Sequence, residues 1–509
     1  MAPITTHHSE QGHCMPSESI VPGFMLVQGN RTESLRQLAV EWLRRHPLAP
    51  LEREVFLVQS NGIAQWLKQS LARNRAEHDG GCGIAAALEM QLPARLQWQA
   101  YRAVLGDLPE ASPFDKPALL WRLMRLLPSL ADAVYAPLQR FLQDDTDGRK
   151  CYQLAGKLAD LFDQYQVYRA DWLRDWENRQ ETAVPPEQRW QPALWRAILA
   201  DTPPDERHSS RAAVHRRFLA AAEKLTASSR VTKWPRRVVV FGISSMPQQT
   251  LEVLAAMARC TQVVFFVNNP CQQYWGDSEV THPLLASWGS QGRDYMRLLS
   301  EHDDRKAYEA WCAENELKLD LFETPSPDTL LGQLQGDILQ LLSLDERKEK
   351  NTTVDGNDHS IVFHIAHSPQ REVEILHDQL LAAFAADPAL QPRDIMVMVP
   401  DINAYAPHIQ AVFGQLPRDD HRYIPFTLAD QQQRQQKPLL IALEHLLRMD
   451  QSRFAASEIL DLLDVPALRE RFGLAETDLP LLRRWVSGAG IRWGLDATQR
   501  AALGMPAAM

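Results

Sequence analysis

Two glutamines and an asparagine gather just after a short apolar run. The run Val55–Gln59 is followed by SNGIAQWL, which places Asn61 in a turn and Gln65 on the first turn of a helical pattern. Loops at the carboxyl ends of parallel strands are where such sheets bind ligands. Side-chain amides offer a donor and an acceptor together, which suits the edges of nucleic-acid bases. The same spacing also fits an N-capped helix with a buried Trp66, and spacing alone favours that second interpretation.

Positive charge gathers further along the chain, between Arg207 and Arg237. This stretch carries nine arginines and lysines against one acid, Glu223, a local charge of +8 in a chain of net charge −10. Contact with a phosphate backbone is one use of such a stretch, and a solvated helix face is the other. Five aromatics could stack on unpaired bases, although their spacings are more typical of a core: Trp98, Tyr165, Tyr168, Trp190 and Trp195.

The stretch QGNRTES, residues 28–34, has the position of a phosphate-binding loop without its chemistry. It links an apolar run to a helical pattern, yet it holds one glycine, no lysine and a displaced Thr32. Asn30, Thr32 or Ser34 would each serve to cap the following helix. The strands in RRVVVFGISSMP and DIMVMVPDINAY end without the carboxylates or the arginine of an ATPase. We therefore expect no cofactor and no catalytic residue on this chain, and no metal, since QDDTDGRK (143–150) lacks calcium-loop spacing.

Size and composition indicate a multidomain cytoplasmic protein. A chain of 509 residues exceeds one hydrophobic core, which predicts two to four domains. No apolar run reaches the roughly 18–20 residues that cross a bilayer, and residues 1–23 lack a secretory signal and are predicted to be a disordered tail. The six cysteines are scattered without a CxxC pair, as in a reducing compartment.

The elements that must position these residues alternate between strand and helix. Nearly continuous apolar runs predict buried strands, and helical patterns follow most of them, so we expect parallel sheets flanked by helices. Between about 95 and 232 only amphipathic stretches occur, which predicts a helical insertion in the first sheet. A second α/β domain is expected to begin at Ile361, with Ser368 as the N-cap of its first helix and Pro369 as the first helical residue. The predicted strands are Met25–Gln28, Val55–Gln59, Val238–Phe241, Val263–Val267, Ile361–Ala366 and Ile395–Val399.

Six stretches, in order along the chain, resemble the RecC family, the gamma chains of exodeoxyribonuclease V. They are LVQSNGIAQWL, KLADLFDQYQVYRADWL, NPCQQYWGD, HPLLASWGSQGRDY, HSPQREVEILHDQLL and PRDIMVMVPDI. The resemblance runs from about Met25 to Asp496 and covers about the first half of that family's chains. It implies an α/β protein with two degenerate superfamily 1 helicase (RecA-like) parallel-sheet domains and helical insertions.

The implied domain layout follows the pattern already described. The first RecA-like domain comprises 24–98 and 232–344, interrupted by a helical domain at 99–231. A linker at 345–360 leads to a truncated second RecA-like domain at 361–440, and 441–509 begin a further helical domain.

The resemblance also implies a function. Chains of this family are non-motor, DNA-binding subunits of an ATP-dependent helicase–exonuclease that prepares double-strand breaks for repair by homologous recombination. They form a heterotrimer with RecB-like and RecD-like subunits, which use the ATP and magnesium. They contact double- and single-stranded DNA, help to split the duplex, and recognise the Chi sequence in the single strand. Neither ATPase nor nuclease activity is implied for this chain itself.

The family's Chi-reading residues can be carried over where the motifs match. VQSxGxAQW gives Gln59 and Gln65, LPAxxxW gives Leu92 and Trp98, and RAAVHRRF gives Arg211 by a weaker match. Asn61 replaces the family's threonine, so the recognised octamer is left open. ADLFDQYxVYR gives the remaining residues, Asp160, Leu161, Asp163, Gln164 and Arg169. Two alternatives stay open: an active helicase or ATPase, and a structural scaffold without DNA contact.

Overall fold

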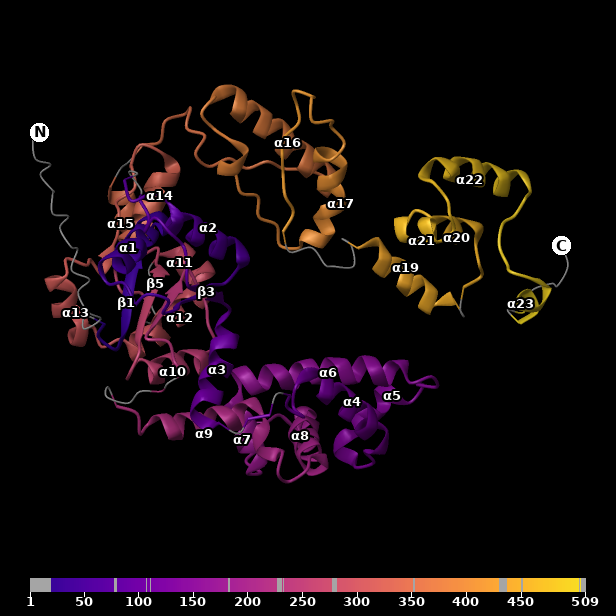
Figure 1. Ribbon diagram of the computed structural model, residues 1–509, viewed down its shortest axis with the longest axis horizontal. Coiled ribbons are helices and arrows are strands. Elements are labelled where there is room, and N and C mark those ends of the chain that lie inside the picture. Colours follow the sequence, from indigo (N-terminus) through magenta and orange to yellow (C-terminus); the bar gives the residue numbers. More distant parts are fainter. Residues whose placement is uncertain are drawn as a thin grey trace, which may run out of the picture. The chain divides into compact units, whose positions relative to one another are not determined.

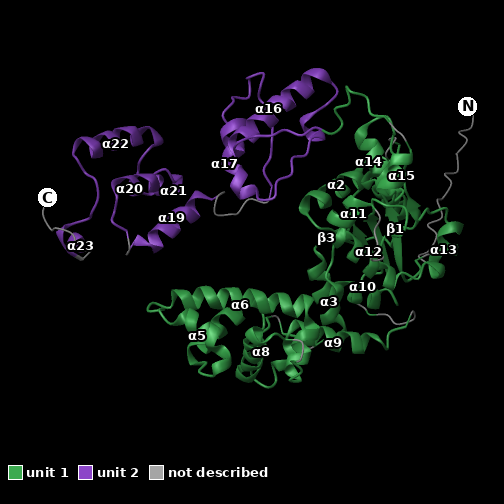
Figure 2. Ribbon diagram, turned by 180° about the vertical axis from the view of Figure 1, so that it is seen from behind, with its two compact units in different colours: residues 1–361 green, residues 362–509 purple. Residues whose placement is uncertain are grey.

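The chain folds into two compact units, residues 1–361 and 362–509, which Figure 2 colours separately. The computed structural model describes residues 20–76, 80–106, 108–109, 111–181, 184–226, 231, 233–276, 282–350, 353–429, 437–449, 452–502 and 504. Most of the tail predicted at 1–23 therefore lies outside the described residues. Its last residue, Gly23, already belongs to a strand.

Unit 1 is built on a six-stranded sheet in which all neighbouring strands are parallel (Figure 1). The strand order is β3-β2-β4-β5-β1-β6. In this register Met25 lies opposite Val264, and Leu57 lies opposite both Val240 and Gln91. The predicted α/β class is confirmed. The strands are β1 (Gly23–Gly29), β2 (Glu54–Leu57), β3 (Leu88–Gln91), β4 (Arg237–Phe241), β5 (Gln262–Asn268) and β6 (Asp320–Leu321).

Helices cover both faces of the sheet, which explains why its central strands are apolar without alternation. Successive residues of β1 point to opposite faces, so Phe24 and Leu26 join one hydrophobic cluster while Met25 and Val27 join the other. The first cluster is covered by α3 (Pro93–Leu105), α9 (Arg211–Ala222), α10 (Gln248–Met257), α11 (Pro283–Trp288) and α12 (Ser290–His302). The second is covered by α1 (Thr32–Arg45), α2 (Asn61–Ala72) and α13 (Arg305–Glu314).

Between β3 and β4 the chain leaves the sheet and builds a helical segment with its own core. Phe162 and Trp195 are fully buried there with ring centroids 5.6 Å apart, so Trp195 is a core residue. The buried Gln166 ties this core to α9, because its Nε2 donates to the Phe114 carbonyl at 3.0 Å and its Oε1 accepts from the Arg211 N–H at 3.0 Å. The helices are α4 (Lys116–Leu126), α5 (Ala136–Leu142), α6 (Arg149–Tyr168), α7 (Ala170–Glu177) and α8 (Trp190–Asp201).

Part of the segment 345–360, predicted as a linker without periodicity, is helical. It follows α14 (Leu330–Leu339) and overlaps α15 (Leu344–Glu349), which Ser343 and Glu346 start with a capping box. The residues after α15 also return to α14, since Asp358 and Ser360 accept from the first two N–H groups of that helix. This helix could not be predicted from hydrophobic periodicity, because its short sequence LDERKE has no apolar face.

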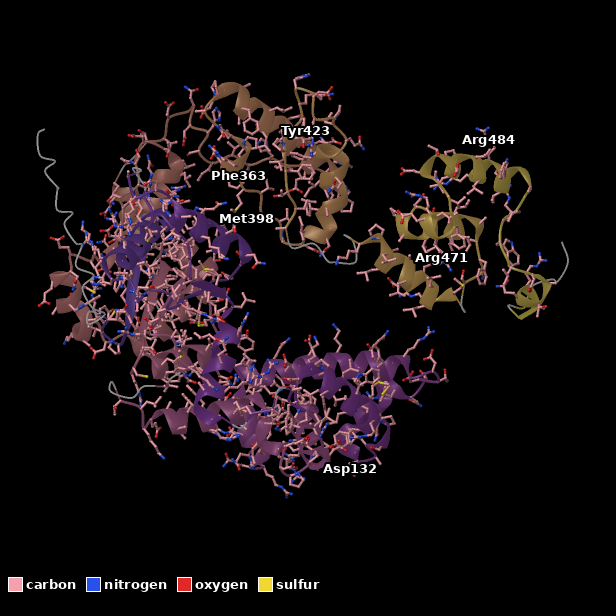
Figure 3. All side chains as sticks on the ribbon, in the orientation of Figure 1. Asp132, Phe363, Met398, Tyr423, Arg471 and Arg484 are labelled. Atoms are coloured by element: carbon pink, nitrogen blue, oxygen red, sulfur yellow. The ribbon has the colours of Figure 1, made fainter. Side chains whose placement is uncertain are left out.

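Unit 2 differs from the prediction, because its described residues form helices and no strand. Ser368 does cap α16 (Pro369–Ala386), accepting from the Arg371 N–H at 3.3 Å. The predicted strands Ile361–Ala366 and Ile395–Val399 are wrong, and Phe363 and Met398, labelled in Figure 3, are 88% and 85% exposed. Two apolar runs without further strand partners do not make a stable sheet in water. The other helices are α17 (Ile402–Phe413), α19 (Pro438–Leu447), α20 (Ala456–Leu462), α21 (Pro466–Arg471), α22 (Leu479–Gly488) and α23 (Ala497–Ala502).

Two features are absent from the part of the chain that the structure describes. None of the helices in this part of the chain is long and apolar enough to cross a membrane. The same residues contain no group of three or more His, Cys, Asp or Glu side chains placed to hold a metal ion.

Candidate nucleic-acid interface

The amides predicted to read bases lie at the carboxyl edge of β2, next to the end of β3. Val58 donates to the Gln91 carbonyl at 3.2 Å, so Gln59 and Leu92 leave the sheet as neighbours. Gln59, Asn61 and Gln65 are exposed, and no described protein atom hydrogen-bonds their side chains. Leu92 is 57% exposed at the same edge. The sheet therefore brings four of the predicted residues together with their side chains available to a ligand.

Ser60, rather than Asn61, caps the helix that follows. Its side chain accepts from the Ile63 N–H at 3.4 Å, so the helix start does not consume the Asn61 amide. Trp66 is half-buried against Phe241, with the Arg36 guanidinium 5.4 Å from its ring centroid. The capped helix proposed from spacing is therefore real, and it coexists with free amides.

Trp98 lies on α3 beside a pocket of about 360 Å³. The ring is half-buried and meets Tyr101 edge-on at 5.6 Å, which fixes its orientation. Asp115 lines the same pocket and lies 3.6 Å from Arg211. The pocket thus connects Trp98 to a second group of predicted residues on α6 and α9.

That second group is an ion-pair cluster. Arg211 reaches Asp163 at 3.2 Å, and Lys116 bonds Asp160 at 2.5 Å. Burial raises the pKa of the Asp163 carboxyl despite the attraction of Arg211. The hydrogen bond from Lys116 holds the pKa of Asp160 below its usual range. Lys116 and Asp115 were missed in the sequence, because their role depends on α4 packing against α6.

The remaining residues carried over on α6 do not join this cluster. Leu161 packs into the helical core, since it lies about 100° around the helix from Asp160. Gln164 is exposed beside Asp163. Arg169 ends the helix, stacked 3.7 Å from the Trp172 ring centroid and paired with Asp171 at 2.9 Å. Arg169 is therefore already occupied by its neighbours.

The basic stretch 207–237 is less available to phosphate than its charge suggested. Arg237 is fully buried, with Nε donating to Glu54 at 3.1 Å and Nη2 donating to the His46 carbonyl at 2.7 Å. Arg207 donates to the carbonyls of Thr202 and Ala200, and Arg211 is paired as described. A role for Arg237 in phosphate contact is wrong, because the charge of Glu54 and the sheet interior hold its side chain.

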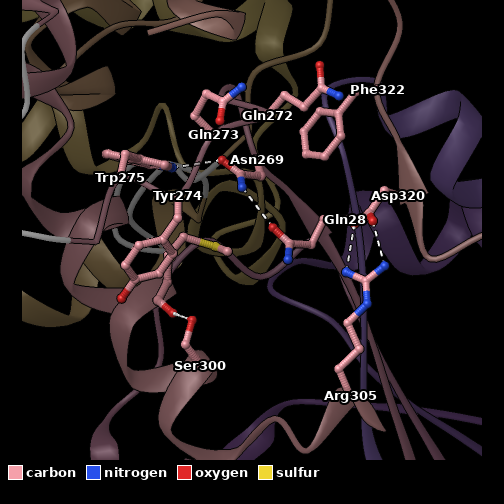
Figure 4. Close-up of a pocket in the computed structure, with 11 residues that line it drawn as sticks. Gln28, Asn269, Gln272, Gln273, Tyr274, Trp275, Ser300, Arg305, Asp320 and Phe322 are labelled. Atoms are coloured by element: carbon pink, nitrogen blue, oxygen red, sulfur yellow. Dashed lines mark hydrogen bonds and ion pairs between the residues drawn. The ribbon is translucent and has the colours of Figure 1, made fainter. Parts of the chain in front are cut away.

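The polar side chains of the loop QGNRTES are bonded to the end of β5 and to residues after β6 instead of being open toward a phosphate: Asn268 donates to Thr32 at 3.2 Å, and Arg31 pairs with Glu323 at 3.1 Å. Figure 4 shows the neighbouring pocket, of about 250 Å³, where Asn269 donates to Gln28 at 2.8 Å and Arg305 pairs with Asp320 at 2.6 Å. Thus the only arginine among the residues that line this pocket is already neutralised. The capping prediction for this loop is wrong: Arg31 occupies the N-cap position without a side-chain hydrogen bond to the helix, while Asn30 donates to the Glu323 carbonyl at 2.8 Å.

The geometry of the sheet and of its loops defines a class of protein. It is an α/β protein of the RecA-like type, with a helical insertion and with amides, an aromatic ring and ion pairs where its ligand loops lie. Residues 24–341 match the family described as RecC, N-terminal domain, and residues 436–509 match the RecBCD enzyme subunit RecC fourth domain.

The chain belongs to the RecC family. It is 38% identical to the RecBCD enzyme subunit RecC of Escherichia coli (strain K12), over 95% of this chain and 46% of that protein. It is 34% identical to the RecC subunit of Haemophilus influenzae, over 94% of this chain and 47% of the relative, and 31% identical to that of Mycolicibacterium smegmatis, over 90% and 42%. The chain spans about half the length of the curated relatives it matches.

Proposed function

We propose that this chain is the non-motor, DNA-binding subunit of a cytoplasmic ATP-dependent helicase–exonuclease that acts in double-strand-break repair by homologous recombination. Its partners are RecB-like and RecD-like subunits, which bind the ATP and magnesium. The chain helps to split the duplex and recognises Chi in the emerging single strand. The observation that carries this proposal is the exposed amide group of Gln59, Asn61 and Gln65 at the sheet edge, in a chain of the RecC family.

The proposed contacts divide by chemistry. Gln59, Asn61 and Gln65 bond base edges, Trp98 stacks on a base, and Leu92 offers an exposed apolar side chain at the sheet edge. Arg211, held by Asp163, approaches the phosphate backbone, and Asp160, Leu161, Gln164 and Arg169 shape the channel wall. The Asn61 amide in place of a threonine alters the hydrogen bonds available at one position, so we propose that the preferred octamer differs from that of the threonine-bearing relatives.

The test is the Chi response of the complex reconstituted with its partner subunits. Gln59→Ala and Gln65→Ala should each abolish Chi-dependent attenuation of nuclease activity, since one good base contact is worth about 1–3 kcal/mol of discrimination. Gln188→Ala, an exposed glutamine in the helical segment, is the matched control and should respond as the wild type does. An unchanged Chi response in both variants would remove the site assignment.

Two alternative functions predict different experimental results. An active helicase or ATPase predicts single-strand-stimulated ATP hydrolysis by the purified chain, and the self-paired polar groups around Gln28 and Arg305 argue against it. A scaffold without DNA contact predicts no crosslinks between single-stranded DNA and the segment 59–98 in the assembled complex.

A further inference from the structure

Four polar and aromatic residues of α3 share one face of that helix. Arg95, Trp98, Gln99 and Arg102 follow the spacing i, i+3, i+4 and i+7, which stacks them along the helix axis. All four line the pocket of about 360 Å³ that also holds Ser112, Asp115 and Ser209. None of Arg95, Gln99 and Arg102 belongs to the residues assigned above to DNA.

The two arginines of this face have no acidic partner among the residues that the structure describes. Arg95 and Arg102 are exposed, and no described carboxylate lies within ion-pair distance of either. Asp115 is the acid of the pocket, and it accepts from the Ser112 N–H at 2.8 Å and pairs with Arg211 at 3.6 Å. Two uncompensated positive charges therefore border a cavity whose negative charge is already engaged.

Between the arginines lie an aromatic ring and an amide. The Arg102 guanidinium is 5.7 Å from the Trp98 ring centroid, and Tyr101 supports the ring edge-on. The exposed Gln99 accepts from Gln91 Nε2 at 3.4 Å, which leaves the N–H donors of Gln99 unused. A held ring flanked by cations and an amide donor suits a nucleotide, which presents a flat base and a charged phosphate.

We propose that this face of α3 is a nucleotide subsite for single-stranded DNA, in which Arg95 and Arg102 contact phosphates and Gln99 bonds the base that stacks on Trp98. The subsite rests on the proposed function, because it extends the path that leaves Gln59 and Leu92. It adds two backbone contacts and one specificity contact to that path.

The experiment measures the affinity of the 509-residue chain for a fluorescein-labelled oligothymidylate at several salt concentrations. Arg95→Gln and Arg102→Gln should each weaken binding and lower the slope of log affinity against log salt by about 0.7, the value for one phosphate contact to a single strand. Trp98→Ala should weaken binding by about 5- to 150-fold without changing the slope. Arg140→Gln on α5, another exposed arginine of the helical segment, should leave both quantities unchanged.

The other outcomes show whether the subsite alone fails or the proposed function fails with it. If the wild-type chain binds and Gln59→Ala weakens it, while both arginine variants behave like Arg140→Gln, only the subsite is overturned. If the wild type does not bind single strands, both proposals fail. Preferential binding of an equally long duplex, with the same loss in the arginine variants, would assign the arginines to duplex DNA and also overturn the subsite. Trp98→Phe, which keeps a ring, should restore much of the affinity lost in Trp98→Ala, and equal loss in both would exclude stacking.

Discussion

At the scale of single residues, the arginines of this protein show how position decides the use of one charge. Arg237 is enclosed by the sheet and neutralised by Glu54, and Arg211 is shared between two aspartates. Arg95 and Arg102, by contrast, are exposed and without a described acidic partner. The sequence counts the charge of all four equally, whereas the exposed pair keeps more electrostatic attraction for a polyanion than the two paired arginines do.

The buried ion pair between Arg237 and Glu54 predicts that one substitution strongly lowers the stability of the protein. Arg237→Ala should lower the free energy of unfolding by about 3–5 kcal/mol, because it leaves the Glu54 carboxylate uncompensated in a site where that side chain is 13% exposed. Urea unfolding followed by circular dichroism measures this. Arg53→Ala is the control, since Arg53 pairs with Glu89 at 3.6 Å while 76% exposed, and it should cost about 0–1 kcal/mol. Equal stability of the two variants would contradict the structural role of Arg237.

At the scale of elements, strands buried on both faces were predictable and edge strands were not. The apolar runs at Met25, Val55, Val238 and Val263 became β1, β2, β4 and β5 with shifts of one or two residues. The edge strands β3 (LEMQ) and β6 (DL) are short and partly polar, so no apolar run marks them. The Ile361–Ala366 run had the right composition, but composition does not supply a pairing partner.

The residues of the candidate site also differ in how far the local sequence predicts their positions. Gln59 and Gln65 could be placed from the sequence, because a carboxyl-edge loop follows directly from a parallel strand. The cluster of Lys116, Asp163 and Arg211 could not, since it requires three helices far apart in sequence to pack together. The spacing of Arg95 and Arg102 around Trp98 can be read from the sequence. It indicates a binding face only together with the pocket that these residues line and the absence of described acidic partners.

The close contact between Gly29 and β6 predicts that a side chain at position 29 destabilises the protein, which would not be expected in an open phosphate-binding loop. A Cβ on Gly29 would lie 2.7 Å from the Leu321 carbonyl oxygen of β6, so Gly29→Ala should cost about 1–3 kcal/mol through forced displacement of that strand. Gly23→Ala, at the opposite end of β1, is the control, because its Cβ would meet only Met25 Cε at 3.6 Å. Chemical denaturation compares them, and hydrogen exchange at the Gln28 N–H, bonded to the Leu319 carbonyl at 2.8 Å, locates the change. Equal stability of the two variants would mean that β6 does not close this edge.

At the scale of the whole molecule, all residues proposed to contact DNA belong to unit 1. That unit contains the six-stranded sheet, and the hydrophobic clusters on both faces of the sheet and in the helical segment consist of residues of unit 1. Unit 2 has a smaller cluster around Val373, Phe413 and Ile424, and it exposes apolar side chains such as Phe363 and Met398. It also carries exposed arginines, among them Arg471 and Arg484, labelled in Figure 3.

This division predicts that a fragment comprising residues 20–361 binds single-stranded DNA as the full chain does. Its affinity should agree within about twofold, and the salt slope should be unchanged, because every proposed phosphate contact is retained. Fluorescence anisotropy with the same oligothymidylate measures both, and Arg471→Gln with Arg484→Gln in the full chain is the complementary control. A fragment that remains folded but binds more than about tenfold more weakly would place a substantial share of the contacts in unit 2. A reduced salt slope in the double variant would then identify its arginines as those contacts, whereas an unchanged slope would direct the search to the other cations of unit 2.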